Sequence, residues 1–359
     1  GVNCLNDLLA ALNHPELETE KVYQPRIRAE DLLREGTGQD TGDFREVAGQ
    51  ENAKRGAEIA AAGFHNLLMI GPPGVGKSMV AGRIPGILPP LTLKESLEVT
   101  GIFSVAGLLP PGQALITRRP FYAPHHTVTQ AALIGGGSGI PRPGMVSLAH
   151  RGVLFLDELP EFRKNVLDGM RQPMEERKVQ IARSAGMVTY PSDFILVAAM
   201  NPCPCGYYPD RNKCRCTQPQ IEKYLGKISG PILDRIDLCV ELHPVDILHL
   251  QKTKTEKSSE DMKRQIRHAR ERQAERFAGT DCRFNGDIRS AQVEEYCPLG
   301  EEGQKVMEQL YRTLQLSARV YHRILKTART IADLEDREEI TGEHLLEAAC
   351  YRPSETYWN

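Results

Sequence analysis

The amino-acid sequence predicts an α/β fold in which a parallel central sheet is followed by a small all-α domain. Short apolar runs of strand length recur between residues 67 and 242, with segments of helical periodicity among them. Beyond residue 261 the apolar spacing is helical throughout. Alternation of strands and helices favours a parallel sheet, because each parallel connection needs a crossover that is usually a helix.

The composition is that of an ordinary soluble protein with about two domains. Apolar residues make up 40% and charged residues 26% of the 359 positions, and the net charge is −2. Any nucleic-acid-binding surface must therefore be local. No window approaches the roughly 18 apolar residues of a membrane span, and no signal peptide is apparent. We expect a cytoplasmic protein without a membrane partner, whose nine cysteines are reduced or bound to metal.

The first predicted strand leads into a phosphate-binding loop. The apolar run 67–70 is followed by G-P-P-G-V-G-K-S, which fits the pattern G-x-x-x-x-G-K-[ST]. Glycines let backbone N–H groups turn towards a phosphate, and the helix that follows directs its positive end there. We expect the loop to bind ATP, with the lysine on the β- and γ-phosphates and the serine on Mg²⁺. The predicted contacts are Gly71, Pro72, Pro73, Gly74, Val75, Gly76, Lys77 and Ser78.

Two later strands end in polar residues suited to the same chemistry. The apolar run 153–156 is followed by Asp157 and Glu158. We expect the first carboxylate to hold the Mg²⁺ shell and the second to polarise the attacking water. Another buried strand, 194–199, is followed by Asn201, whose amide can orient that water. An asparagine that begins a turn before the next proline is the alternative for this position.

Two further segments of the first domain are unusual. Residues 100–150 are rich in glycine and proline, and an irregular stretch of this length is usually functional or mobile. His125 and His126 lie in it, and we expect local hydrogen bonds there, because adjacent histidines are poorly spaced to chelate one ion. Residues 177–190 form two alternating runs around a Ser-Ala-Gly turn, which predicts a β-hairpin.

Four cysteines beyond Asn201 form a candidate metal site. They stand in two C-x-C pairs, and four thiolates are a ligand set for tetrahedral Zn²⁺. The spacing is tighter than the usual C-x₂-C, so a loop of reduced, metal-free thiols is the alternative. The loop also carries basic residues and tyrosines on which bases can stack, although a solvated charged loop explains them equally well. These residues are Cys203, Cys205, Cys214 and Cys216, with Tyr207, Tyr208, Arg211, Lys213, Arg215, Lys223 and Lys227.

The chain is expected to divide into a main domain and a helical domain. Residues 1–43 are interpreted as a linker or the remnant of an upstream domain, and residues 44–245 as the ATP-binding core. A polar linker, 246–261, leads to the helical domain at 262–353 and a tail at 354–359.

The order of these motifs resembles the AAA+ ATPases. More closely, it is similar to their magnesium-chelatase-like branch and, within it, to the ComM/YifB family of competence-associated branch-migration helicases. The resemblance extends from about Asp43 to Arg352. The motifs that carry it include A-P-H-H-T at 123–127, G-V-L-F-L-D-E-L-P at 152–160, A-M-N-P-C-P-C-G at 199–206, S-G-P-I-L-D-R-I-D at 229–237 and S-A-R at 317–319.

The resemblance implies roles for three polar residues. Asn201 would be the first sensor, Arg235 the arginine finger in a neighbouring subunit's site, and Arg319 the second sensor on a helical lid. An ion pair with a neighbouring aspartate is the alternative for Arg235, and Arg323 lies one helical turn beyond Arg319 and can replace it. A cation supplied in trans stabilises the transition state and ties hydrolysis to assembly.

The resemblance also implies an assembly and a substrate. We expect a homo-oligomeric ring, a hexamer, with the hairpin and the insertion facing the pore and Lys178 and Arg183 on a DNA backbone. ATP hydrolysis would drive DNA translocation or branch migration, with recombination or competence proteins as partners. A chelatase-like or protein-remodelling ATPase that acts on a protein partner is one alternative, and a nucleotide switch with negligible turnover is another. Family members usually carry a Lon-protease-like domain ahead of the ATPase, so we interpret the chain as a fragment that lacks most of it.

Overall fold

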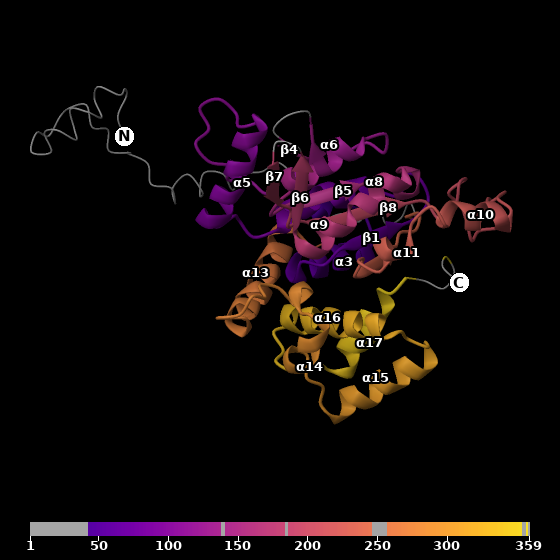
Figure 1. The fold of residues 1–359 in the computed structure, drawn as a ribbon. Coiled ribbons are helices and arrows are strands. Elements are labelled where there is room, and N and C mark those ends of the chain that lie inside the picture. The colour runs from indigo at the N-terminus through magenta and orange to yellow at the C-terminus, as the bar shows by residue number, and fades with distance from the viewer. Residues whose placement is uncertain (1–41, 138–140, 184–185, 246–256, 354–356, 358–359) are drawn as a thin grey trace, which may run out of the picture.

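The computed structural model describes residues 42–137, 141–183, 186–245, 257–353 and 357. At its centre lies a sheet of five strands, all paired in parallel (Figure 1). The predicted α/β class is therefore confirmed. Most of the predicted N-terminal linker, much of the linker before the helical domain and most of the tail lie outside the described residues. The strand order is β2 (Phe121–Tyr122), β5 (Val153–Leu156), β8 (Ile195–Met200), β1 (Leu67–Ile70) and β9 (Leu238–Glu241).

The middle strands are apolar because both faces of the sheet are covered. Every residue of β1, β5 and β8 is buried, as expected for parallel strands between layers of helices. Leu67 and Met69 point into the cluster around α3 (Glu51–Gly63) and α4 (Lys77–Ile87). Leu68 and Ile70 point into the hydrophobic cluster on the other face of the sheet.

The remaining elements of the core domain precede β1 or lie on the connections between these strands. The segment expected to be a hairpin consists of the antiparallel strands β6 (Lys178–Arg183) and β7 (Gly186–Pro191). The other elements are η1 (Phe44–Glu46), α5 (Leu93–Ala106), α6 (Gln130–Ile134), β3 (Gly135–Gly136), β4 (Arg142–Pro143), α7 (Met145–Leu148), η2 (Leu159–Glu161), α10 (Gln218–Leu225) and α11 (Gly230–Leu233).

The segment 164–176 consists of two helices and not of one continuous helix. They are α8 (Lys164–Gly169) and α9 (Arg171–Glu176), which meet at Met170. Pro173 has no N–H to donate to the carbonyl four residues earlier, so the hydrogen-bond ladder of one continuous helix is interrupted at this point.

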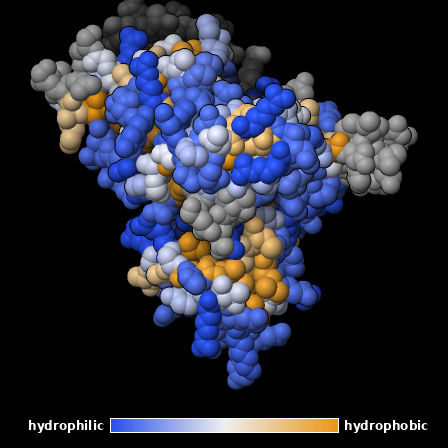
Figure 2. Space-filling model, turned by 90° about the vertical axis from the view of Figure 1, so that its right-hand side faces the viewer, coloured by the Kyte–Doolittle hydropathy of each residue, from blue (hydrophilic) through white to orange (hydrophobic). Residues whose placement is uncertain are grey.

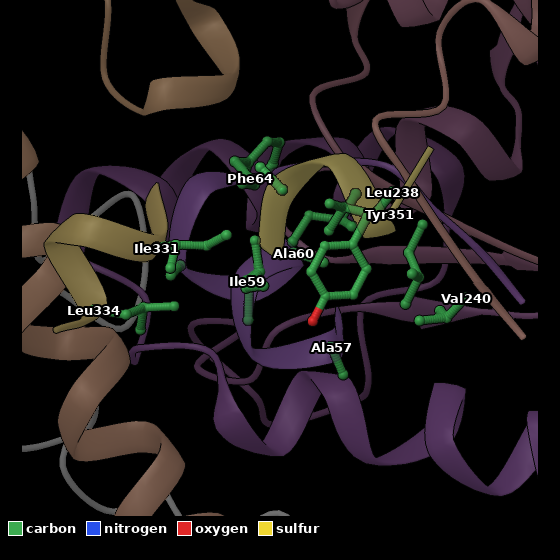
Figure 3. Packing of buried hydrophobic residues seen from close by; sticks show 14 of the residues in the cluster. Ala57, Ile59, Ala60, Phe64, Leu238, Val240, Ile331, Leu334 and Tyr351 are labelled. Atoms are coloured by element: carbon green, nitrogen blue, oxygen red, sulfur yellow. The ribbon is translucent and has the colours of Figure 1, made fainter. Parts of the chain in front are cut away.

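The helical domain packs directly on α3. Its elements are α13 (Ser259–Arg276), η4 (Asn285–Asp287), η5 (Ser290–Gln292), α14 (Val293–Tyr296), α15 (Glu301–Thr313), α16 (Ala318–Leu334) and α17 (Gly342–Cys350). Figure 3 shows Ile331 of α16 near Ile59 and Ala60 of α3, with β9 beyond them. Helix α3 therefore lies between the sheet and much of the helical domain.

Hydrophobic residues are unevenly distributed over the surface. Figure 2 shows mostly hydrophilic residues over the core domain, with hydrophobic residues gathered lower down, at the level of the C-terminal helices. Within the described ranges, no helix is both long and apolar enough to cross a membrane.

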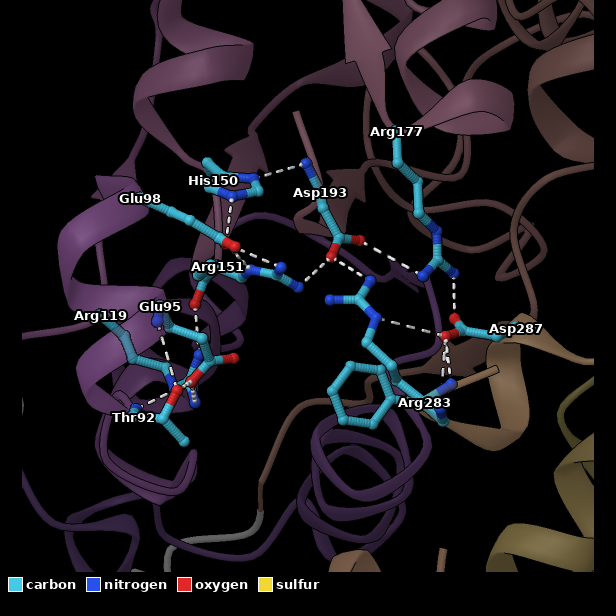
Figure 4. A network of polar contacts seen from close by, with 11 residues as sticks. Thr92, Glu95, Glu98, Arg119, His150, Arg151, Arg177, Asp193, Arg283 and Asp287 are labelled. Atoms are coloured by element: carbon cyan, nitrogen blue, oxygen red, sulfur yellow. Dashed lines mark hydrogen bonds and ion pairs between the residues drawn. The ribbon is translucent and has the colours of Figure 1, made fainter. Parts of the chain in front are cut away.

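A buried polar network joins the insertion, the hairpin and the helical domain. Its centre is Asp193, whose side chain is 4% exposed and faces Arg151, Arg177 and Arg283 (Figure 4). Burial raises the pKa of this carboxyl group, and Arg177 and Arg151 oppose the rise. Arg177 lies just before β6 and also pairs with Asp287 of η4. One carboxylate thus connects arginines from three parts of the chain.

Candidate nucleotide site

The phosphate loop connects the buried strand β1 to the first turn of α4. Gly74 and Gly76 have φ angles of +80° and +95°, and a Cβ added to either would meet nothing within 4 Å. Glycine is therefore required at these two positions by the left-handed backbone conformation, and not by a lack of space for a side chain. Gly76 is the N-cap of α4 and offers no side-chain cap, so N–H groups of the first turn are available to an anion.

Lys77 lies at the centre of the site. Its Nζ donates to the carbonyl oxygens of Gly71 at 2.6 Å and Pro72 at 2.9 Å, and to Oδ1 of Asn201 at 3.1 Å. Burial lowers the pKa of Lys77, and the carboxylates of Asp157 and Glu158 oppose that effect. The ammonium group is thus held where a phosphate can exchange for the two carbonyls.

The two acidic residues differ in their surroundings. Asp157 accepts a hydrogen bond from Ser78 Oγ at 2.8 Å, so the two expected Mg²⁺ ligands are already in contact. Glu158 has a left-handed backbone with φ of +51°, and its side chain is 55% exposed. The geometry suits the expected division of roles, with one carboxylate on the metal and the other facing water.

The contact between His126 and Glu158 was not predicted from the sequence. Nδ1 of His126 lies 3.4 Å from Oε2 of Glu158. His125 instead makes a local contact with Thr127, with 2.9 Å between Nδ1 and Oγ1. The available signal was the position of these histidines just after a short strand, β2, which pairs with β5.

The position of Gln50 beside the phosphate loop was not predicted from the sequence either. Its Nε2 donates to the carbonyl oxygens of Val75, at 3.3 Å, and His243, at 2.6 Å. The side chain therefore ties the phosphate loop to the chain just after β9. Nothing in the local sequence distinguishes this glutamine from an ordinary residue at the start of a helix.

Arg235 lies at the opposite edge of the sheet. Its carbonyl accepts from the side chain of Asn66, which precedes β1, whereas the phosphate loop follows β1. Because β1 has four residues, the two edges are about 13 Å apart at roughly 3.3 Å per residue. The guanidinium, 18% exposed, pairs with Glu175 and donates to the Pro231 carbonyl at 2.5 Å. Burial lowers the pKa of Arg235, as do the charges of Arg319 and Arg171.

Arg319 lies beside Arg235 rather than at the phosphate loop of its own chain. Its exposed side chain pairs with Asp234, which directly precedes Arg235. The buried side chain of Arg323 donates to the Asp234 carbonyl at 3.4 Å. The structure therefore separates the predicted residues into two groups, with Lys77, Ser78, Asp157, Glu158 and Asn201 at one edge and Arg235 and Arg319 at the other.

The four cysteines of the candidate metal site come together. Their sulfur atoms all lie within 4.8 Å of one another, and Sγ of Cys203 is 3.3 Å from that of Cys205 and 3.8 Å from that of Cys214. Tetrahedral Zn²⁺ with Zn–S bonds of about 2.3 Å requires sulfur separations of about 3.8 Å. Burial acts to raise the pKa of Cys205, but backbone N–H groups of Tyr207 and Arg215 lower it to about 6, whereas burial and the neighbouring thiols raise the pKa of Cys214 and of Cys216. The donor set fits Zn²⁺.

Comparison with known proteins identifies the family. Residues 43–250 match the family model for magnesium chelatase, subunit ChlI, and residues 256–352 match the model for the C-terminal part of that subunit. The chain belongs to the magnesium chelatase ChlI family. This is a family of AAA+ ATPases that use ATP and Mg²⁺, which agrees with the sheet and with the contacts at Lys77 and Ser78.

Several relatives of this ChlI-family chain are similar over most of its length. "Uncharacterized protein YifB" of Salmonella typhimurium is 46% identical over 314 residues, covering 87% of this chain and 60% of that protein. "Competence protein ComM" of Haemophilus influenzae is 43% identical over 357 residues, covering 97% and 66%. The "Magnesium-chelatase 67 kDa subunit" of Chlorobaculum parvum is 25% identical over 241 residues, covering 62% and 34%. The chain thus spans about 60% of the length of YifB.

We predict that replacing Lys77 with alanine strongly weakens nucleotide binding by this ChlI-family chain. The affinity should fall on the order of 100-fold, because a charge-assisted contact with phosphate contributes about 3 kcal/mol. Titration with a fluorescent ATP analogue measures this, with Lys94→Ala on the exposed face of α5 as the matched control. Micromolar affinity retained in Lys77→Ala would contradict the assignment of the loop.

Proposed function

We propose that this chain is the ATPase part of a ring-shaped DNA motor, a hexamer in which ATP hydrolysis drives translocation or branch migration of DNA. The observation that carries the proposal is the separation of the site into two groups at opposite edges of the sheet. Arg235 is too far from Lys77 of its own chain to reach the same triphosphate, and we infer that it serves one bound by a neighbouring subunit. Head-to-tail contacts of this kind close into a ring.

The charges around Arg235 suit an anion-binding site. Burial lowers the pKa of Arg235, the charges of Arg319 and Arg171 lower it further by repulsion, and a γ-phosphate would relieve that repulsion. Its partner Glu175 is 59% exposed, so the ion pair is of the weak kind that a phosphate can replace. An arginine finger contributes about 10³–10⁵-fold to turnover. Arg319, on the same edge, would serve the neighbouring site as well.

DNA is the substrate that the similarity to a competence protein favours. The hairpin carries an exposed lysine, Lys178, at its base and exposed Met187 near its tip. The cysteine loop adds exposed Tyr207, and Arg211 lies over the ring of Tyr208 at 4.9 Å. Bases stack on such rings, and cations of the loop would contact phosphates. Action on a protein partner, as in a chelatase, is the second candidate, favoured by the likeness to a magnesium-chelatase subunit.

The cysteine loop is proposed to hold one structural Zn²⁺. Cys203, Cys205, Cys214 and Cys216 would supply four thiolates, and no position would remain for water. Backbone N–H groups already point at these sulfurs, including that of Tyr208 towards Cys203 at 3.4 Å. Such hydrogen bonds stabilise thiolates and orient metal ligands. The metal would stabilise the loop without taking part in hydrolysis.

We predict that ATP turnover rises when branched or single-stranded DNA is added, and that moderate salt removes the stimulation. Phosphate contacts release counterions, so DNA affinity falls steeply with salt concentration. Turnover should be measured at low and moderate salt, with and without DNA, and with Glu158→Gln as the variant that keeps ATP and loses hydrolysis. Turnover unchanged by DNA at low salt would exclude the DNA motor, and stimulation by a protein alone would favour the second candidate.

We predict that Lys77→Ala and Arg235→Ala subunits are each inactive but regain turnover when mixed. A random equal mixture pairs an intact Lys77 with an intact neighbouring Arg235 at about one quarter of the interfaces, so about one quarter of wild-type turnover should return. Arg235→Ala alone should still bind the fluorescent ATP analogue. No recovery from mixed subunits, despite ring assembly by both, would contradict a shared site.

We predict one zinc ion per chain in protein purified without chelators. Elemental analysis should give this ratio for the wild type and for Cys350→Ser, whose cysteine is exposed on α17. Cys216→Ser should lose the zinc, because three thiolates hold a structural ion less tightly than four. A ratio near zero in the wild type would reject the site.

A further inference from the structure

The cysteine loop touches the phosphate loop through its backbone. Gly206, directly after Cys205, has φ of +87°, and a Cβ added to it would lie 2.6 Å from Cδ of Pro73. Real Cβ atoms do not approach another atom so closely, so the Gly206 backbone lies against the proline ring. The Gly206 N–H donates to the carbonyl of Cys203 at 3.0 Å. The contact therefore belongs to the turn that carries the first two thiols.

The same loop is joined to Asn201. Cys203 is fully buried two residues after Asn201, in the cluster that contains Tyr224 of α10. Oδ1 of Asn201 accepts a hydrogen bond from Nζ of Lys77 at 3.1 Å. The cysteine loop thus contacts the phosphate loop at the Pro73 ring and begins two residues after Asn201 in the chain.

We propose that the cysteine loop is a metal-dependent clamp that sets the position of Pro73 and Asn201 and so controls the affinity for ATP. The inference rests on the zinc site proposed above. A metal that joins the two C-x-C pairs removes the conformational freedom of the loop between them. With the ion bound, Gly206 holds the Pro73 side of the phosphate loop. Without it, the loop relaxes and the backbone N–H groups that bind phosphate lose their alignment.

The clamp accounts for a glycine that the phosphate-loop pattern does not require. Gly206 lies outside the G-x-x-x-x-G-K-S segment, but only a residue without Cβ fits against Pro73. The clamp also makes nucleotide binding depend on the supply of zinc, although zinc would not contact the triphosphate. Pro73 and Gly206 are positioning residues in this scheme, because they act through the backbone of the phosphate loop.

The test compares Gly206→Ala with Gly279→Ala in the full chain. Gly279 also has a left-handed backbone, with φ of +79°, but a Cβ there would meet nothing within 4 Å. The control therefore carries the same backbone strain without the contact. Because misplacing a binding group by about 1 Å costs on the order of tenfold or more, Gly206→Ala should bind the fluorescent ATP analogue at least tenfold more weakly than Gly279→Ala. Both should keep one zinc per chain and similar thermal unfolding.

A double variant makes the contact itself testable. In Gly206→Ala/Pro73→Ala the ring atom that would clash is gone, so the ATP affinity should return to that of Pro73→Ala alone. Equal affinity in Gly206→Ala and Gly279→Ala would overturn the clamp. So would a double variant whose loss is the sum of the two single losses, because independent sites add.

A separate arm tests the dependence on metal. Cys216→Ser should lose both zinc and ATP affinity, whereas Cys350→Ser should keep both. Zinc lost with ATP affinity unchanged would overturn the metal-dependent clamp. Absence of zinc from the wild type would overturn the zinc site and the metal dependence together, and the glycine variants would then still decide whether the loop contact controls nucleotide binding.

Discussion

The parallel pairing of β5, β8 and β1 is the constraint on which the nucleotide site depends. Ile70 lies opposite Met200, and Leu156 opposite Ala198, so the three strands end at one edge of the sheet. That register brings Lys77 to Asn201 and Ser78 to Asp157. A shift of β8 by one residue would turn its side chains to the other face and break the contact with Lys77. The register is specified because every residue of these strands is buried on one face or the other.

The arginines at the edge of the sheet opposite the phosphate loop fall into two groups. The groups differ in whether the carboxylate partners are buried or exposed. Arg151, Arg177 and Arg283 face the buried carboxylate of Asp193, and removing that carboxylate would take one ion-pair partner from each arginine of a buried network. Arg235 and Arg319 instead pair with Glu175 and Asp234, which are 59% and 45% exposed. Exposed pairs contribute about 0–1 kcal/mol, so an incoming phosphate can replace them at little cost. The first group holds the fold together, and the second is suited to bind a ligand.

The sequence was sufficient where a function is encoded in adjacent residues. The phosphate loop, the strand before Asp157 and the α/β class follow from contiguous patterns, and the family that they resemble is confirmed. Contacts between distant segments could not be predicted. His126 meets Glu158 only because β2 pairs with β5, and Gln50 reaches Val75 only because α3 packs beside the loop. The four cysteines meet as their spacing suggested, and zinc in that cluster remains a prediction.

Helix α3 fixes the position of the phosphate loop relative to the opposite edge of the sheet. At its N-cap, Gln50 holds the carbonyl of Val75 in the phosphate loop. At its C-cap, Phe64 stacks on Phe284 of the helical domain, with ring centroids 4.8 Å apart. Between them, small side chains such as Ala60 let the helix approach β9 on one side and α16 on the other. A single rigid element therefore spans from the phosphate loop to the domain that carries Arg319.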